Sequence, residues 1–211
     1  NVILDDANIV RAAKSSVGAC FANSGQTCSA LTRLIIPENK KEEIIEIITS
    51  RVAGFTAGDP LDESTRCGPM ASARQQASVS DFIASGISEG ATLLSGGEGM
   101  PDGLEVGFFV KPTAFADVTP DMKIWNEEVF GPLLTITTYS SEEEALALAN
   151  DSEYGLSGGV WSENEERAIS FAKNMRTGQV SINGGPFNIS APFGGYKMSG
   201  NGRELGIHGL Q

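Results

Sequence analysis

Hydrophobic residues recur at spacings of three and four in five long segments of the 211-residue chain. This periodicity predicts helices over about residues 7–22, 37–55, 72–89, 142–150 and 163–175. Shorter apolar and β-branched runs predict strands over residues 34–36, 91–94, 108–114, 133–139 and 180–182. Strands that alternate with helices of this length are typical of a three-layer α/β/α fold with a mostly parallel, doubly wound sheet.

The residues between these segments predict where some of the elements begin and end. Asp5 or Asp6 is expected to cap the first helix, and Gly178 is expected to be the C-cap glycine of the last helix. The 28 residues from Gly184 hold eight glycines and little periodicity, which predicts a long irregular segment that serves a site or an interface. Because no repeat or low-complexity linker interrupts the chain, we expect one domain over residues 1–211.

Charge and composition exclude several classes of function. Acidic residues outnumber basic ones by 27 to 15, and the net charge of −12 does not suit binding to a phosphate backbone. No apolar run approaches the roughly 18 residues of a membrane span, and we expect no leader peptide. Three cysteines at unrelated spacings fit neither a disulfide framework nor a zinc site. We therefore expect a cytoplasmic protein without a nucleic-acid or membrane partner.

The chain contains one histidine, His208. A catalytic triad, a Cys-His dyad or a multi-histidine metal site would have to use it, so we expect no metal, and a cysteine is the strongest candidate nucleophile. Cys20 lies on the apolar face of the first helix and is expected to be buried, whereas Cys67 lies in a loop and is expected to be exposed. Cys28 follows a helix break, where free backbone N–H groups can lower a thiol pKa and bind an oxyanion. On these local grounds alone, a functional and a structural role for Cys28 are equally supported.

The glycine-rich stretch over residues 194–202 does not have the pattern of a nucleotide site. It lacks the G-K-[ST] ending of a P-loop, and Leu205 stands where a dinucleotide fingerprint needs glycine or alanine. A structural loop is the better interpretation. The acidic runs at residues 142–144 and 163–166 are typical of the first turns of helices and indicate no function.

Three motifs in the chain belong together. Residues 21–30 read F-A-N-S-G-Q-T-C-S-A and are followed by Arg33, residues 126–132 read N-E-E-V-F-G-P, and residues 192–206 read P-F-G-G-Y-K-M-S-G-N-G-R-E-L-G. In order and separation they resemble the active-site cysteine signature, the E-E-x-F-G-P segment and the C-terminal P-F-G-G block of the aldehyde dehydrogenase superfamily. The resemblance covers the whole chain.

This resemblance implies a small-molecule aldehyde as substrate and NAD or NADP as cofactor. It implies that Cys28 is the catalytic nucleophile and that Glu128 binds the ribose hydroxyls of the nicotinamide half, with Phe130 packed nearby. Phe193 matches a position that lines the aldehyde channel. Glu204 matches a carboxylate near the active site that supports proton transfer.

The chain also departs from the superfamily pattern. The dinucleotide-binding domain, the E-L-G-G-K stretch with its general-base glutamate and the asparagine that gives a second oxyanion donor are absent, and the superfamily's final β-strand would follow Gln211. We therefore expect residues 1–211 to be the catalytic domain of a longer protein that forms a homodimer or homotetramer. The isolated chain is expected to be inactive without the dinucleotide-binding half.

Three alternatives stay open at this point. The first is an aldehyde dehydrogenase that passes its acyl group to coenzyme A. The second is a thiol esterase or acyl-transfer enzyme of the same fold, against which Glu128 and Phe130 speak, because a hydrolase needs no nicotinamide site. The third is a non-catalytic structural protein, like the related lens crystallins, against which the intact cysteine signature speaks.

Overall fold

The computed structural model describes residues 1–210, which contain one seven-stranded sheet. The strands lie in the order β3-β4-β5-β2-β1-β6-β7, and all neighbours are parallel except the antiparallel pair β3–β4. Their bounds are β1 (Val2–Ile3), β2 (Arg33–Pro37), β3 (Thr92–Ser95), β4 (Thr113–Ala116), β5 (Leu133–Tyr139), β6 (Ser157–Trp161) and β7 (Gln179–Ile182). The predicted mostly parallel α/β sheet is confirmed.

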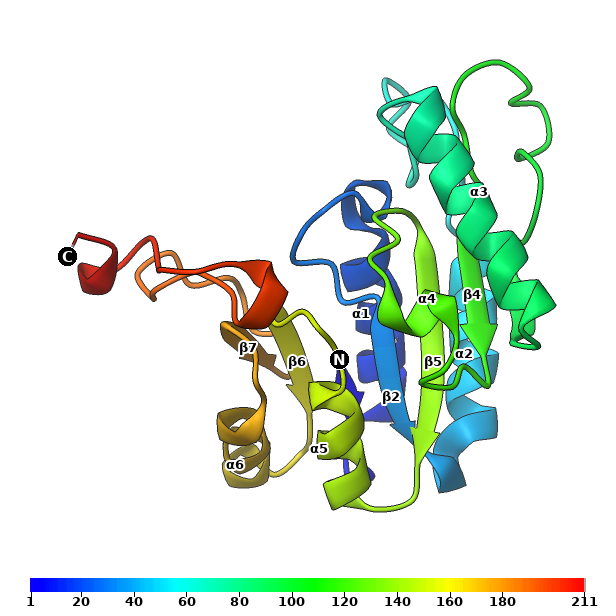
Figure 1. Cartoon of the computed structure of the whole chain (residues 1–211). Coiled ribbons are helices and arrows are strands. Elements are labelled where there is room, and N and C mark those ends of the chain that lie inside the picture. The colour runs from blue at the N-terminus through cyan, green and yellow to red at the C-terminus, as the bar shows by residue number, and fades with distance from the viewer. Residues whose placement is uncertain (211) are drawn as a thin grey trace.

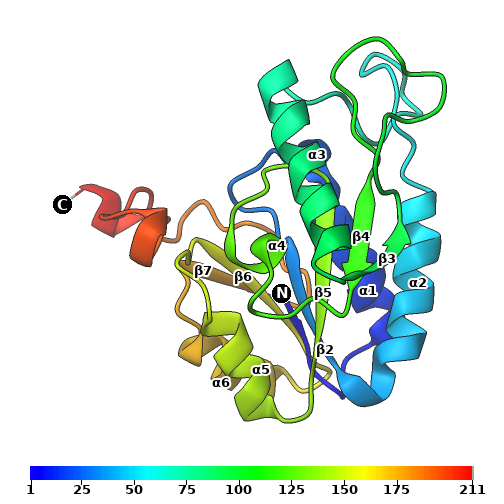
Figure 2. The same cartoon turned by 45° about the vertical axis from the view of Figure 1, so that its right-hand side comes forward.

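Helices cover both faces of this sheet (Figures 1 and 2). One face carries α1 (Ile9–Phe21) and α2 (Lys41–Ala53), and the other carries α3 (Ala73–Ser88), α4 (Lys123–Asn126), α5 (Glu142–Asn150) and α6 (Glu165–Asn174). Successive side chains of a strand point to opposite faces. In β2, Leu34 and Ile36 accordingly pack with α1 and α2, whereas Ile35 packs in the core on the opposite face. The two cores make the three-layer arrangement.

Several predicted element boundaries are wrong. The N-cap of α1 is Asn8, whose side chain accepts a hydrogen bond from the backbone of Arg11, and not Asp5 or Asp6. Asp5 and Asp6 instead form salt bridges with the guanidinium of Arg167 in α6. Residues 108–112 form no strand, and β4 begins only at Thr113.

Gly178 does not cap a helix either, because α6 ends at Asn174 and its C-cap is Met175. Glycine is needed at position 178 for a different reason. A Cβ atom there would lie 1.8 Å from the carbonyl oxygen of Gly194, so only a residue without a side chain fits. This contact joins the start of β7 to the C-terminal segment.

The segment after β7 leaves the sheet as an extended arm (Figures 1 and 2). Its regular structure up to Leu210 consists of two short 3₁₀ turns, Lys197–Ser199 and Ile207–Leu210, as expected for an irregular segment. The arm exposes several large apolar side chains, among them Phe187, Ile189 and Met198. Gln211 and the strand expected after it lie outside the described residues. Among residues 1–210, no helix is both long enough and apolar enough to span a membrane.

Candidate active site

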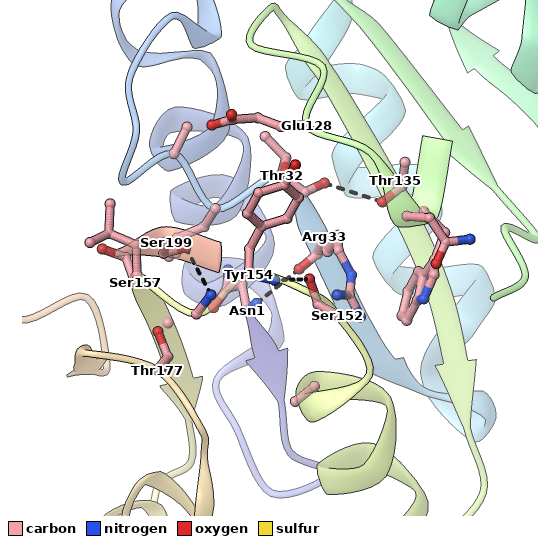
Figure 3. A pocket seen from close by; sticks show the side chains of 18 of the residues that line it. Asn1, Thr32, Arg33, Glu128, Thr135, Ser152, Tyr154, Ser157, Thr177 and Ser199 are labelled. Carbon is pink, nitrogen blue, oxygen red and sulfur yellow. Dashed lines mark hydrogen bonds between the residues drawn. The ribbon is translucent and has the colours of Figure 1, made fainter. Parts of the chain in front are cut away.

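A pocket of about 350 Å³ opens at the amino ends of four parallel strands. Its walls come mainly from the segments before β2, β5, β6 and β7, with one 3₁₀ turn of the arm, and Figure 3 shows Glu128, Tyr154 and Thr177 from three of these segments around the same space. Open α/β sheets more commonly bind ligands at the carboxyl ends of their strands. Cys28 and Glu128 both line this pocket, although a hundred residues separate them in the sequence.

The chain between α1 and β2 forms a strained turn, here called the cysteine turn (residues 22–30). Three successive residues adopt left-handed backbone conformations, with φ of 52° at Asn23, 57° at Ser24 and 71° at Gly25. Asparagine and glycine tolerate this region better than other residues, whereas serine is strained there. The left-handed backbone of the turn thus explains why asparagine and glycine occupy positions 23 and 25 of the cysteine motif.

Hydrogen bonds to a neighbouring loop hold the cysteine turn in place. The Ser24 hydroxyl donates to the carbonyl oxygen of Gly68 at 3.1 Å. The side chain of Gln26 donates to the carbonyl of Pro69 at 3.3 Å and accepts from the backbone N–H of Ala71 at 2.8 Å. These contacts fix the backbone immediately before Cys28.

Cys28 is exposed and lies in a tight turn closed by a 3.0 Å hydrogen bond from the backbone of Ala30 to Thr27. Within residues 1–210 its own backbone N–H donates to no acceptor. Its exposure gives substrates and reagents access to the thiol, as reactive cysteines require.

The other two cysteines are buried, and burial raises the pKa of both thiols. For Cys20 this was expected, but the expectation of an exposed Cys67 is wrong. Backbone hydrogen bonds tie Cys67 to Thr56 and Gly58, just after α2, and turn its side chain into the interior. A buried thiol ionises less readily and is harder for a reagent to reach.

We therefore expect Cys28 to react before Cys20 and Cys67 with a limiting amount of iodoacetamide. The native protein should carry the label on Cys28, and all three cysteines should label after denaturation. Peptide mass mapping of the two samples measures this. Native labelling of Cys20 or Cys67 ahead of Cys28 would contradict the burial described above.

Glu128 and Phe130 lie in the segment between α4 and β5. Glu128 is exposed and lines the pocket, whereas Phe130 is half-buried, has φ of 53° and does not line it. Gly131 next to them lies against the cysteine turn, since a Cβ atom on Gly25 would be 2.1 Å from the Gly131 carbonyl oxygen. The two motifs are thus in direct backbone contact.

A cation on an aromatic ring forms part of the pocket wall. The guanidinium of Arg33 stacks 3.6 Å from the ring centre of Trp125 and donates to the carbonyl of Leu148 at 2.6 Å. Burial lowers the pKa of Arg33 to about 10, so the group is still a cation at neutral pH. The sequence analysis named Arg33 only as part of a motif and did not name Trp125. The signal that could have found Trp125 is its position directly before the N-E-E-V-F-G-P motif.

The pocket also has unpaired polar groups in its wall. Within residues 1–210, Arg33 Nε, Trp125 Nε1 and Thr177 Oγ1 are buried without a hydrogen-bond partner, and all three residues line the pocket. An unpaired buried donor costs roughly 1–3 kcal/mol. These three atoms lie within the wall itself, so the cost falls on the protein whether or not the pocket is filled.

Phe193 and Glu204 lie in the arm and not in the pocket. Their backbones pair through two hydrogen bonds of 2.7 Å, and the Phe193 ring meets Phe187 edge-on with centroids 5.6 Å apart. Glu204 is exposed. Cys28 and Glu128 therefore line the same pocket, and Phe130 lies in the same segment as Glu128 without lining it. Phe193 and Glu204 pair with each other in the arm and do not line the pocket. Residues 1–210 contain no cluster of three His, Cys, Asp or Glu side chains that could hold a metal ion.

Fold and pocket together define a doubly wound α/β domain with an exposed thiol and a carboxylate at one opening. Residues 1–211 match the aldehyde dehydrogenase family along their whole length, so the chain belongs to that family.

Relatives and solved structures of this family resemble the chain closely. A 3-succinoylsemialdehyde-pyridine dehydrogenase from a Pseudomonas species is 47% identical over all of the chain and 44% of its own length. A geranial dehydrogenase from Castellaniella defragrans is 43% identical over 97% of the chain and 42% of its own length. The chain thus spans less than half the length of these relatives.

Among solved structures, a variant of aldehyde dehydrogenase C from Pseudomonas syringae, in complex with NAD⁺ and octanal, superimposes with a TM-score of 0.97 at 44% identity. That match covers 100% of this chain and 43% of the other. An aldehyde dehydrogenase from Mycobacterium tuberculosis in complex with NAD⁺ gives 0.96 at 44% identity, over 99% of this chain and 43% of the other.

Proposed function

We propose that residues 1–211 are the catalytic domain of a longer NAD(P)-dependent aldehyde dehydrogenase that oxidises a small-molecule aldehyde to a carboxylic acid. The observation that carries this proposal is that Cys28 and Glu128 line one pocket, because hydride transfer needs the thiol that holds the aldehyde and the carboxylate that binds the ribose to face the same space. The solved relative from Pseudomonas syringae in complex with octanal supports an aldehyde as substrate.

Cys28 performs the covalent step. Its thiolate attacks the carbonyl carbon of the aldehyde, a C–S bond forms, and the carbonyl oxygen becomes an oxyanion that the free N–H of Cys28 stabilises. The bound nicotinamide supplies the acceptor for the hydride that leaves the same carbon. Cys28 then carries the acyl group as a thioester until water cleaves the C–S bond and restores the thiol.

The residues of the pocket suit a nicotinamide dinucleotide. Glu128 is an exposed carboxylate, and its two oxygens accept hydrogen bonds from the two hydroxyls of a ribose diol. Phe130 follows two residues later and is proposed to pack near that ribose. Solved relatives in complex with NAD⁺ support the same choice of cofactor. Phe193 and Glu204 are proposed to reach the substrate channel from the arm.

The remaining partners follow from the length of the relatives. Since the chain spans about 44% of them, we propose that the rest of the full-length protein holds the dinucleotide-binding half and that the protein assembles as a homodimer or homotetramer. Three free cysteines fit a reducing compartment, and we propose the cytoplasm. A panel of aldehydes assayed with NAD⁺ and NADP⁺, with and without coenzyme A, tests the proposed reaction on the full-length protein.

Replacing Glu128 by glutamine should weaken hydride transfer by about 10-fold, because the neutral amide offers one acceptor oxygen instead of two charged ones. Hydrolysis of a nitrophenyl ester, which needs only the thiol and the oxyanion donor, should stay within about twofold. The measurement compares both activities in the full-length variant. Glu127→Gln is the matched control, since Glu127 is also exposed and lines the same pocket. Equal losses of both activities in Glu128→Gln would assign Glu128 to folding.

A further inference from the structure

Phe130 holds a backbone conformation that an aromatic residue rarely adopts. Its φ of 53° lies in the left-handed region, which costs a residue with a side chain on the order of 1–3 kcal/mol. Such a conformation persists only where neighbouring groups enforce it. The residue stands two positions after Glu128, so whatever enforces it also sets the path of the chain beside the pocket.

One side chain from α3 holds this segment. Gln75, in the first turn of α3, donates from its amide nitrogen to the carbonyl of Val129 at 3.1 Å and to that of Phe130 at 3.0 Å. An amide NH₂ has two hydrogens, and two consecutive carbonyl oxygens use both of them. Gln75 is half-buried, so these bonds are partly shielded from water.

Close backbone packing extends this hold from α3 to the cysteine turn. Val79 stands one helical turn after Gln75 on the same face of α3, and a Cβ atom on Gly131 would lie 2.5 Å from its Cγ2. On the other side, a Cβ atom on Gly25 would lie 2.1 Å from the Gly131 carbonyl oxygen. Residues 129–131 are therefore confined between α3 and the turn that carries Cys28.

We propose that Gln75 is a positioning residue. Its two hydrogen bonds hold Phe130 in the left-handed conformation and so orient the segment from Glu128 to Phe130 toward the nicotinamide dinucleotide. This inference rests on the proposed function for its effect on the nucleotide, but the bracing of Phe130 stands on the contacts alone.

The test uses Gln75→Met and Gln75→Glu in the full-length protein. Both keep the length of the side chain and remove the N–H donors. Gln76→Met is the matched control, because Gln76 is the next residue of α3, is also half-buried and donates one bond to the carbonyl of Phe109 at 2.9 Å, away from Phe130. Both Gln75 variants should raise KM for the nucleotide about 10-fold, because a segment that is no longer held must be ordered when the nucleotide binds. KM for the aldehyde and ester hydrolysis should stay within about twofold, and Gln76→Met should leave all three unchanged.

Amide hydrogen exchange gives a readout without activity. The N–H of Leu133, which donates to the carbonyl of Gly131 at 2.8 Å, should exchange faster in both Gln75 variants than in wild type, and Gln76→Met should match wild type there. Unchanged exchange in the Gln75 variants would overturn the bracing role. Faster exchange with unchanged KM for the nucleotide, or an equal loss of ester hydrolysis, would overturn the positioning role. A wild-type protein that reduces neither NAD⁺ nor NADP⁺ with any aldehyde would refute the proposed function, and the exchange data would still decide whether Gln75 braces Phe130.

Discussion

Replacing Cys28 by alanine should abolish aldehyde oxidation in the full-length protein. The loss should be on the order of 10⁴-fold or more, as for removing the nucleophile of other enzymes with a covalent intermediate. The physical reason is that no other described thiol can substitute, because Cys20 and Cys67 are buried. Ester hydrolysis should fall with aldehyde oxidation, since both need the same sulfur.

Rates of aldehyde-dependent nicotinamide reduction measure this loss, with Ser29→Ala as the matched control. Ser29 is the next residue in the same turn, so its replacement tests whether any small change there disturbs the site. That control should retain most of the activity. Activity of Cys28→Ala close to that of Ser29→Ala would show that Cys28 is not the nucleophile.

The second large effect concerns residues 1–211 produced alone, which should fold but should not oxidise aldehydes. Two apolar cores on the faces of a seven-stranded sheet are sufficient for cooperative unfolding. The resemblance assigns the second oxyanion donor and the general base to segments outside this sequence. Losing the first costs about 10²–10³ in rate and losing the second about 10²–10⁴, so turnover should fall below detection.

The measurement is NADH absorbance with aldehyde and excess NAD⁺, beside thermal unfolding followed by near-ultraviolet circular dichroism. The Cys28→Ala form of the same polypeptide serves as the background control. Production of NADH that depends on Cys28 would show that the groups assigned elsewhere are dispensable. Loss of a cooperative unfolding transition would show that residues 1–211 need further chain to fold.

All helices of the described residues except the four-residue α4, and most strands, could be predicted from the sequence because each buries one continuous face. In α3, for example, Val79, Phe82 and Ile83 recur on one side, and the observed helix begins and ends within a residue of the prediction. The strands β1 and β6 were missed for a physical reason as well. β1 has two residues, too few for a periodic pattern, and β6 begins with Ser-Gly-Gly, which favours a loop when taken alone.

The candidate site was predictable only where a residue belongs to a recognisable motif. Cys28 and Glu128 were selected in that way, whereas Gln75 belongs to no motif and its importance depends on which carbonyls it meets. The predicted exposure of Cys67 is wrong for the converse reason. The loop sequence around it favours exposure, but hydrogen bonds to the chain after α2 bury its side chain. Contacts between distant segments leave no periodic signal in the sequence.

The sequence by itself determined the α/β class, the likeness to aldehyde dehydrogenases and the choice of thiol, because these depend on local hydrophobic patterns and on residue types at fixed spacings. The tertiary structure decided what those residues can do together. It put the thiol and the carboxylate at one pocket at the amino ends of the strands, and it kept Phe193 and Glu204 in the arm. It also set α3 against residues 129–131. These placements depend on contacts between segments that are distant in the sequence, such as the close approach of Gly25 to Gly131. The two segments meet because the strands that follow them, β2 and β5, are neighbours in the sheet.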